Sequence, residues 1–239
     1  MVTGLLVLAR CVGFAFRAPG FSHPSVPVPL RAGFALSLAL AIAPELRAVN
    51  FRHDEIYAII GALLVEFLLG SAMGMTASLV YDGAYAGGRI VDDYVGVKAI
   101  APSVVLVAPS GYGRVWSLAF TGAFFLTGAY RPMLLGFADG FHRIGPATAI
   151  DAAQWVGFAA RFAQTFLVVA VQIAAPAIGL AFVVQIALGA LSRVVPRFGS
   201  FTLAFPLAFA AALIATAIVV PIEAAHAPLP RFGIPGMLP

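Results

Sequence analysis

The chain has 239 residues, of which 62% are hydrophobic and 10% are charged, and its formal net charge is +4. Soluble domains carry about 45–50% apolar and about 25% charged residues, so this composition excludes an ordinary water-solvated globule and favours a polytopic membrane protein. The fourteen cationic side chains are scattered singly, which excludes the basic stripe of a nucleic-acid site. The single cysteine, Cys11, excludes an internal disulfide.

The first apolar segment, 2–16, invites interpretation as a signal peptide. It lacks a positively charged start, Arg10 interrupts its apolar run, and no small-residue cleavage site precedes a polar chain. Because signal peptides carry these features, we expect this segment to be a retained membrane helix instead.

Five further segments approach the roughly 20 apolar residues that a spanning helix needs. In chain order they are 32–44, 56–81, 115–130, 162–192 and 198–222. Several fit poorly, since 32–44 is short and the uncharged segment 162–192 is long and contains Pro176. We predict an all-α membrane protein of about six hydrophobic, partly broken helices arranged as helical hairpins. Broken helices in a membrane protein need protein or a cavity around them, so we expect the chain to pack against other subunits.

Three segments are predicted to be irregular. Residues 17–31 contain four prolines, which prevents one continuous helix and favours an extended turn. The apolar middle section 88–114 is interrupted by glycines and two prolines. The tail, 223–239, has four prolines and little charge, which is typical of an irregular extension.

Glu66 stands in an apolar helix, and Gly70 and Gly74 follow at i+4 and i+8, so that the three residues share one face. Small residues let a second backbone come close, and a buried carboxylate must find a partner. We interpret Glu66 as a buried polar contact that fixes helix packing. A proton relay and a glutamate at the membrane edge that reaches water remain alternatives. Gly87 extends the small-residue pattern, and Gly88 is expected to add a break.

Candidate catalytic and metal-binding groups are few. Asp92 and Asp93 are adjacent, but neighbours in sequence need not face one another, and a solvated or cavity-lining turn is favoured. The histidines fall in separate loops or in the tail, without metal spacing: His23, His53, His142 and His226. The sequence also lacks nucleophile-elbow, Walker A and dinucleotide motifs. We therefore expect neither an enzyme nor a cofactor or metal site.

Four stretches follow one another in a distinctive order. They are Arg10 with the Pro-rich segment 17–44, "EFLLGSAMGMTASLVYDGAYAGGRI" at 66–90, "FLVVAVQIAAP" at 166–176, and a last stretch with Gly189, Arg193, Pro196, Phe201 and Pro206. In this order the chain resembles the FliR/SctT family, inner-membrane components of the export gate of bacterial flagellar and virulence type III secretion systems. The family often has Pro-Gln where this chain has Pro196-Arg197, and the stretch "TGAYRPMLL" lacks a histidine common in flagellar members. Both systems remain open, and the virulence type is slightly favoured.

The resemblance implies a multi-pass protein of the bacterial inner membrane. Such a subunit assembles with FliP/SctR-type and FliQ/SctS-type subunits into a channel through which secreted proteins pass. It also implies a FliP-like part over 1–150, a FliQ-like helical hairpin over 151–222, and the tail 223–239. In that hairpin, Pro196 would end one helix and Arg193 would hold the carbonyl groups at its end, with Gly189 and Pro206 contributing to packing.

The resemblance further implies a loop, about 99–113, that plugs the channel from within. Its apolar tip suits a narrow, poorly wetted pore, and its prolines restrict its conformations. The candidate plug residues are Pro102, Val104, Val105, Leu106, Val107 and Pro109. The alternative is a re-entrant or interfacial loop that only anchors the chain.

A second interpretation does not depend on the resemblance to a known family. A small multi-helix transporter or permease subunit would place Glu66 in a substrate or proton path. A membrane-embedded enzyme comes third. An export-gate subunit is expected to be recovered in a hetero-oligomer, whereas a transporter is expected to be stable alone.

Overall fold

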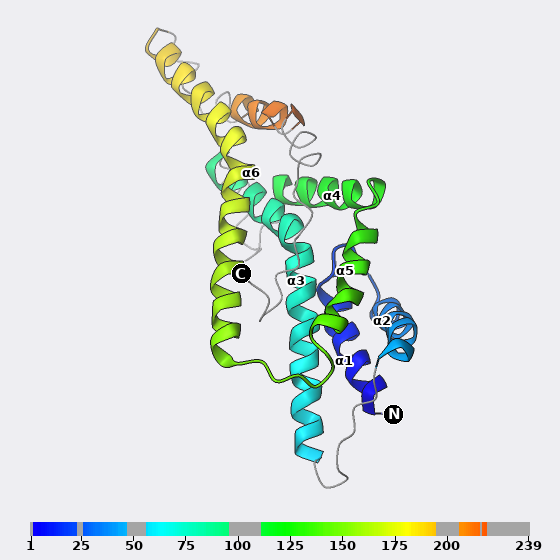
Figure 1. Cartoon of the computed structure of the whole chain (residues 1–239). Coiled ribbons are helices and arrows are strands. Elements are labelled where there is room, and N and C mark those ends of the chain that lie inside the picture. Colours follow the sequence, from blue (N-terminus) through cyan, green and yellow to red (C-terminus); the bar gives the residue numbers. More distant parts are fainter. Residues whose placement is uncertain are drawn as a thin grey trace. The chain divides into compact units, whose positions relative to one another are not determined.

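The structure is a computed structural model, and it describes residues 2–22, 26–46, 56–95, 111–194, 206–215 and 217–218. Within these ranges the chain forms helices joined by short turns, and no strand occurs there (Figure 1). Three of the described helical segments are long and apolar enough to cross a membrane: Val28–Glu45, Ile56–Val95 and Ala152–Val194. The prediction of an all-α membrane protein is confirmed.

Contacts divide the described chain into two compact units. The described residues of Met1–Leu79 and Phe124–Ala163 form unit 1, and those of Val80–Ala123 and Gln164–Pro228 form unit 2. The long helices α3 (Ile56–Val95) and α6 (Ala152–Val194) therefore contribute residues to both.

In unit 1, the first two helices follow the proline pattern of the sequence. α1 (Val2–Arg17) ends just before a turn in which the Phe21 N–H donates to the Ala18 carbonyl at 3.2 Å. α2 (Val28–Ile42) begins directly after Pro27 and runs into the short 3₁₀ turn η1 (Ala43–Glu45). Prolines are tolerated in the first helical turn because its N–H groups have no intrahelical acceptor. Segment 17–31 is thus not one helix, as predicted.

Aromatic rings join α1 to α5 (Tyr130–Arg143) in the core of unit 1. The rings of Phe14 and Phe137 stack with centroids 4.0 Å apart, and Phe137 meets Phe141 edge to face at 5.4 Å. Such pairs add about 0.5–1.5 kcal/mol beyond the apolar area that they bury. Cys11 lies on the same buried face of α1 and is inaccessible to solvent.

α3 is one continuous helix of 40 residues. The break expected at Gly88 is therefore wrong, and so is the irregular conformation expected for the first part of 88–114. A glycine in a helix interior costs only about 1 kcal/mol relative to alanine, and the close approach of the Gly113 backbone at Gly88 offsets that cost. Residues 96–110 lie outside the described part, and α4 (Gly111–Leu126) follows them.

α6 is likewise one helix of 43 residues, and it runs through Pro176. The interruption expected there is not observed. An interior proline removes one backbone hydrogen bond, but Ala174 and Ala177 on either side of Pro176 are buried in unit 2. The packing around the proline holds the helix together. At 1.5 Å per residue, α6 is roughly 65 Å long, about twice the ~30 Å hydrocarbon core of a bilayer.

The core of unit 2 sets large rings of one helix against alanines of three others. On α4, Tyr112, Trp116 and Phe120 recur every four residues and are all buried, so they form one face. The alanines packed in the same cluster come from α3, α6 and the helix Pro206–Ala215: Ala84, Ala174, Ala177, Ala181, Ala208, Ala212 and Ala215. Small side chains let the helix backbones approach while the rings fill the remaining volume.

Candidate functional site

Glu66 on α3 lies in unit 1 with no exposed surface, and its partner is Arg10 on α1, which is 1% exposed. The Arg10 Nε atom donates to Glu66 Oε2 at 2.5 Å. Burying two charges is costly, and their attraction offsets that cost only when the remaining polar atoms also find partners. The membrane-edge alternative for Glu66 is therefore wrong, because the carboxylate does not reach water.

The remaining polar atoms of this pair contact the connection between α5 and α6. Arg10 Nη1 donates to the Ile144 carbonyl at 2.8 Å, and Nη2 reaches the Gly145 carbonyl at 3.5 Å. Glu66 Oε1 accepts the Ala147 N–H at 2.9 Å. The guanidinium also lies 4.3 Å from the centre of the Phe141 ring, within cation–π range. We call Arg10, Glu66 and the backbone groups of 144–147 the Arg10–Glu66 cluster.

Gly70 and Gly74 bring the backbone of α1 against α3, one and two turns after Glu66. A Cβ atom at Gly70 would overlap the carbonyl of Arg10, and one at Gly74 would lie 2.8 Å from the Phe14 carbonyl oxygen. Gly13 on α1 is equally confined, since its Cβ would lie 2.8 Å from the Ser71 nitrogen. The two helices therefore cross at glycines contributed by both, and the Arg10–Glu66 cluster lies at this crossing.

In unit 2, glycines of α3 continue the same kind of contact with other helices. A Cβ atom at Gly87 would lie 2.6 Å from the Ala170 carbonyl oxygen on α6. A Cβ atom at Gly88 would overlap the backbone of Gly113 on α4. The role of these glycines in assembly with other subunits remains a prediction. Within this chain, the backbone of a neighbouring helix already lies against each of them.

Asp92 is buried on α3, whereas Asp93 is exposed. The predicted solvated or cavity-lining turn is wrong here, because α3 continues to Val95 and directs the two side chains differently. Asp92 Oδ1 accepts the N–H of Tyr112 at 3.1 Å, in the first turn of α4. A carboxylate at this position accepts a hydrogen bond from an N–H that lacks an intrahelical acceptor. Its negative charge also interacts favourably with the positive end of the helix dipole.

The other predicted packing residues are far less enclosed. Gly189 is exposed, with open space where a Cβ would lie. Arg193 is exposed in the last turn of α6, and Pro206 is exposed at the start of the helix Pro206–Ala215. Pro196 lies outside the described residues, as does the tail 223–239. The same is true of all the candidate plug residues: Pro102, Val104, Val105, Leu106, Val107 and Pro109.

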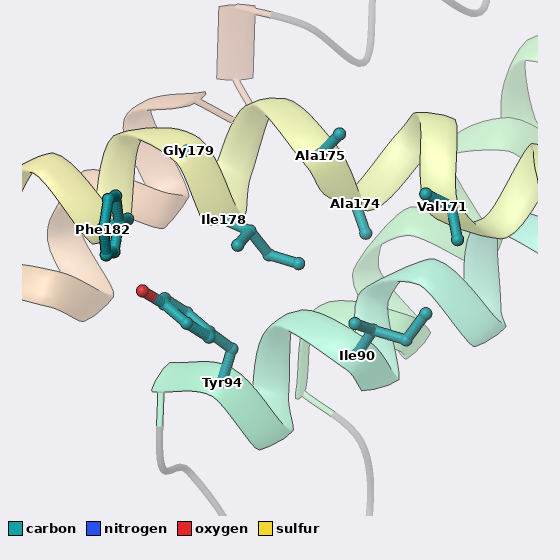
Figure 2. A pocket seen from close by; sticks show the side chains of 8 residues that line it. All are labelled: Ile90, Tyr94, Val171, Ala174, Ala175, Ile178, Gly179 and Phe182. Carbon is teal, nitrogen blue, oxygen red and sulfur yellow. The ribbon is translucent and has the colours of Figure 1, made fainter.

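Unit 2 also has an apolar groove of about 400 Å³ between α3 and α6. It is lined by Ile90, Tyr94, Val171, Ala174, Ala175, Ile178, Gly179 and Phe182. Figure 2 shows Ile90 and Tyr94 projecting from α3 toward α6, with the Tyr94 hydroxyl close to the Phe182 end of the groove. That hydroxyl donates to Gln185 Oε1 at 3.4 Å. The lining suits hydrocarbon or apolar side chains rather than an ionic ligand.

The sequence of this chain also matches a known protein family. Residues 1–227 match the model of the family described as bacterial export proteins, family 1. The chain belongs to this family. The resemblance predicted from the four sequence stretches is confirmed.

Several relatives of this bacterial export family cover most of the chain. FliR of Bacillus subtilis, a flagellar biosynthetic protein, is 26% identical over 88% of this chain and 83% of its own length. FliR of Escherichia coli is 24% identical over 91% of this chain and 84% of its own length. Yop proteins translocation protein T of Yersinia pestis is 28% identical over 75% of this chain and 70% of its own length. Flagellar and Yop-type proteins are thus both similar to this export protein.

Sequence reasoning missed two residues of the crossing in this export protein: Arg10 as the partner of Glu66, and Gly13. Among the described residues, no group of three or more His, Cys, Asp or Glu side chains is placed to hold a metal ion. A signal for the crossing does exist in the sequence. Arg10 is followed by Gly13 one turn later, and Glu66 is followed by Gly70 one turn later, with opposite charges on the two helices.

Proposed function

We propose that this chain is a core subunit of the export gate of a bacterial type III secretion system and forms part of its protein-conducting channel. The observation that carries this proposal is the family match over residues 1–227. Long apolar helices support a multi-pass protein of the inner membrane. Secreted proteins in transit are its cargo, and no enzymatic step is assigned to it.

We infer that the partners are FliP/SctR-type and FliQ/SctS-type subunits. Large apolar side chains remain exposed along α2 and α6, as Leu40 at 68% and Val183 at 59% illustrate. Surface of this kind is covered in the native setting by lipid or by other subunits. The division into a FliP-like part over 1–150 and a FliQ-like hairpin over 151–222 is part of this proposal.

The Arg10–Glu66 cluster speaks against the alternative of a small transporter. A residue in a substrate or proton path faces a cavity or water. Glu66 instead has no exposed surface and is held by Arg10 and by the Ala147 N–H. Its role in the export gate is to fix the crossing of α1 and α3. The shape that the subunit presents to its partners depends on this crossing.

Two measurements test the proposal. A tagged copy of the chain, extracted in mild detergent from its own bacterium, is expected to carry FliP-type and FliQ-type proteins that mass spectrometry identifies. Deletion of the gene is expected to stop either flagellar assembly, read as motility, or secretion of virulence proteins, read in the culture medium. Loss of secretion with motility intact is the result expected from the virulence assignment. A chain that purifies alone, from cells that lose neither property, would contradict the export-gate function.

A further inference from the structure

One apolar stretch of α6 contains a single polar side chain. Between Thr165 and Gln185, every residue is apolar except Gln172. The side chain of Gln172 is exposed, and so are Ala175 and Gly179, one and two turns further along the helix. Residues at i, i+3 and i+7 share one side of a helix. Gln172 therefore places an amide on an otherwise apolar, exposed side of α6.

Pro176 adds a second polar group to the same turn of α6. In an α-helix the carbonyl of residue i accepts the N–H of residue i+4. Because proline has no N–H, the Gln172 carbonyl lacks its ordinary donor, although α6 continues through Pro176. Both the side chain and the backbone of Gln172 can therefore accept a hydrogen bond from outside the helix.

The apolar groove between α3 and α6 lies next to Gln172. Its lining on α6 includes Val171, which precedes Gln172 directly, and also Ala175 and Gly179. Figure 2 shows Val171 and Phe182 at opposite ends of this lining. No atom of the described residues lies within 4 Å of a Cβ built at Gly179. The floor of the groove is therefore open at Gly179, whereas the backbone of α6 closes the space at Gly87 of α3.

The polar groups of Gln172 distinguish between the two kinds of cover that such a surface can have. Exposed apolar surface of this kind is covered in the native setting by lipid or by another subunit. Acyl chains have no hydrogen-bond donor, so lipid would leave the carbonyl and the amide of Gln172 unsatisfied at a cost in free energy. A protein helix can supply apolar side chains for the groove and a polar one for Gln172. The chemistry of this surface therefore favours a helix as its occupant.

We propose that the groove between α3 and α6, together with Gln172, is the docking surface for one apolar helix of another export-gate subunit. That helix packs apolar side chains over Ala175 and Gly179 and donates a hydrogen bond to Gln172 from a serine, threonine or asparagine side chain. Hydrogen bonds of this kind between helices contribute to helix association in membranes. The inference rests on the proposed function and names the surface and the chemistry by which the chain meets its partner.

A groove-filling variant of the tagged full-length chain, expressed in its own bacterium, tests the geometry. Gly179→Leu places a large side chain where it meets no atom of the described residues, so the chain itself should still fold and insert. We expect recovery of the FliP-type and FliQ-type subunits to fall about 5-fold or more, because a packed contact tolerates overfilling poorly. Gly122→Leu on α4 is the matched control, since Gly122 is also exposed and has equally open space. It should leave recovery unchanged.

Gln172→Leu distinguishes a protein occupant from lipid by the direction of its effect. Loss of the hydrogen bond to the Gln172 side chain should lower partner recovery by about 3-fold. If lipid covers this side of α6, leucine is the more favourable residue there, and recovery should stay the same or rise. Gln154→Leu, exposed in the first turn of the same helix, is the control and should have no effect.

A photocrosslink from the groove identifies the occupant directly. Phe182, which is 53% exposed, is replaced by benzoyl-phenylalanine, so that one aromatic ring of the lining substitutes for another. Mass spectrometry should find a crosslinked partner subunit, and adding Gly179→Leu should abolish this product. Crosslinks only to lipid or to a second copy of the chain would overturn the docking surface.

Failure of this inference can be distinguished from failure of the export-gate function. Full partner recovery with Gly179→Leu or with Gln172→Leu, from cells in which the unmodified chain also recovers its partners, would overturn the docking surface alone. Absence of FliP-type and FliQ-type subunits from the unmodified complex would overturn the export-gate function and this inference with it.

Discussion

Asp92 of α3 accepts the backbone N–H of Tyr112 of α4 at 3.1 Å, so that one helix caps the next across an intervening segment of the chain. The side chain of Asp92 is 1% exposed, and the Tyr112 hydroxyl in turn donates to the Phe209 carbonyl at 2.7 Å. α4 is therefore tied at its first turn to α3 and, through Tyr112, to the helix Pro206–Ala215.

Removing this cap should destabilise unit 2. Asp92→Ala is expected to lower the free energy of unfolding by about 1–2 kcal/mol, the usual loss when a capping side chain is truncated. Asp92→Asn keeps an acceptor oxygen and should lose less. Thermal unfolding of the purified chain measures both, and Asp93→Ala on the exposed side should change stability by no more than about 0.5 kcal/mol. Equal losses of unfolding free energy for Asp92→Ala and Asp93→Ala would show that the capping carboxylate stabilises the protein no more than its exposed neighbour does.

Gly70 should not tolerate even one added methyl group. The Cβ of Gly70→Ala would overlap the Arg10 carbonyl, which belongs to a helix backbone and not to a flexible side chain. We expect a loss of about 1–3 kcal/mol in unfolding free energy, and poorer recovery of the assembled complex. Gly61→Ala is the matched control on the same helix, because nothing lies within 4 Å of its Cβ position. That variant should be neutral or slightly stabilising. Similar stability of the two variants would rule out a confined crossing at Gly70.

Breaking the buried ion pair from either side should be costly. Arg10→Met or Glu66→Met is expected to lower the unfolding free energy by about 3–5 kcal/mol, since each leaves an uncompensated buried charge. Replacing both residues by methionine should recover only part of that loss. The reason is that Ile144, Gly145 and Ala147 also use the pair for their backbone hydrogen bonds. A denaturant-unfolding cycle over the four proteins measures the coupling. Full recovery in the double variant would mean that those backbone contacts contribute little.

The plug hypothesis for residues 99–113 is tested in an assembled complex. Deleting 103–108 is expected to raise leakage of ions or small solutes through the channel while leaving the complex intact. A Ser/Gly replacement of the same six positions separates the effects, because it preserves loop length but removes the apolar side chains that exclude water. We expect it to leak as well. An intact mutant complex as tight as the wild type would favour the anchoring loop instead.

How far the sequence predicted the fold depends on whether a contact is local or distant. The glycine face of α3 was readable, because positions i, i+4 and i+8 share a side of any helix. The partner of Glu66 was not, since Arg10 lies 56 residues earlier and the Ala147 amide 81 residues later. No periodicity within one segment reports such pairings.

Two local rules failed because tertiary packing outweighed them. Gly88 reads as a helix break by intrinsic propensity, yet the same missing side chain lets α4 approach, and the helix continues. Asp92 and Asp93 look equivalent in sequence. Only the position of α4 distinguishes the buried capping carboxylate from its exposed neighbour. Local sequence patterns therefore identify which residues are special, while distant contacts decide what those residues do.

Because Cys11 is buried, its reactivity reports the opening of α1 in the wild-type chain. This cysteine is the only one in the sequence, and it lies with no exposed surface beside Arg10 on the packed face of α1. A maleimide should therefore leave the folded protein unlabelled and modify it only when α1 separates from its neighbours. The rate of labelling then times the opening of the crossing without any engineered probe. Conversely, a cysteine introduced elsewhere will react alone, against a silent background.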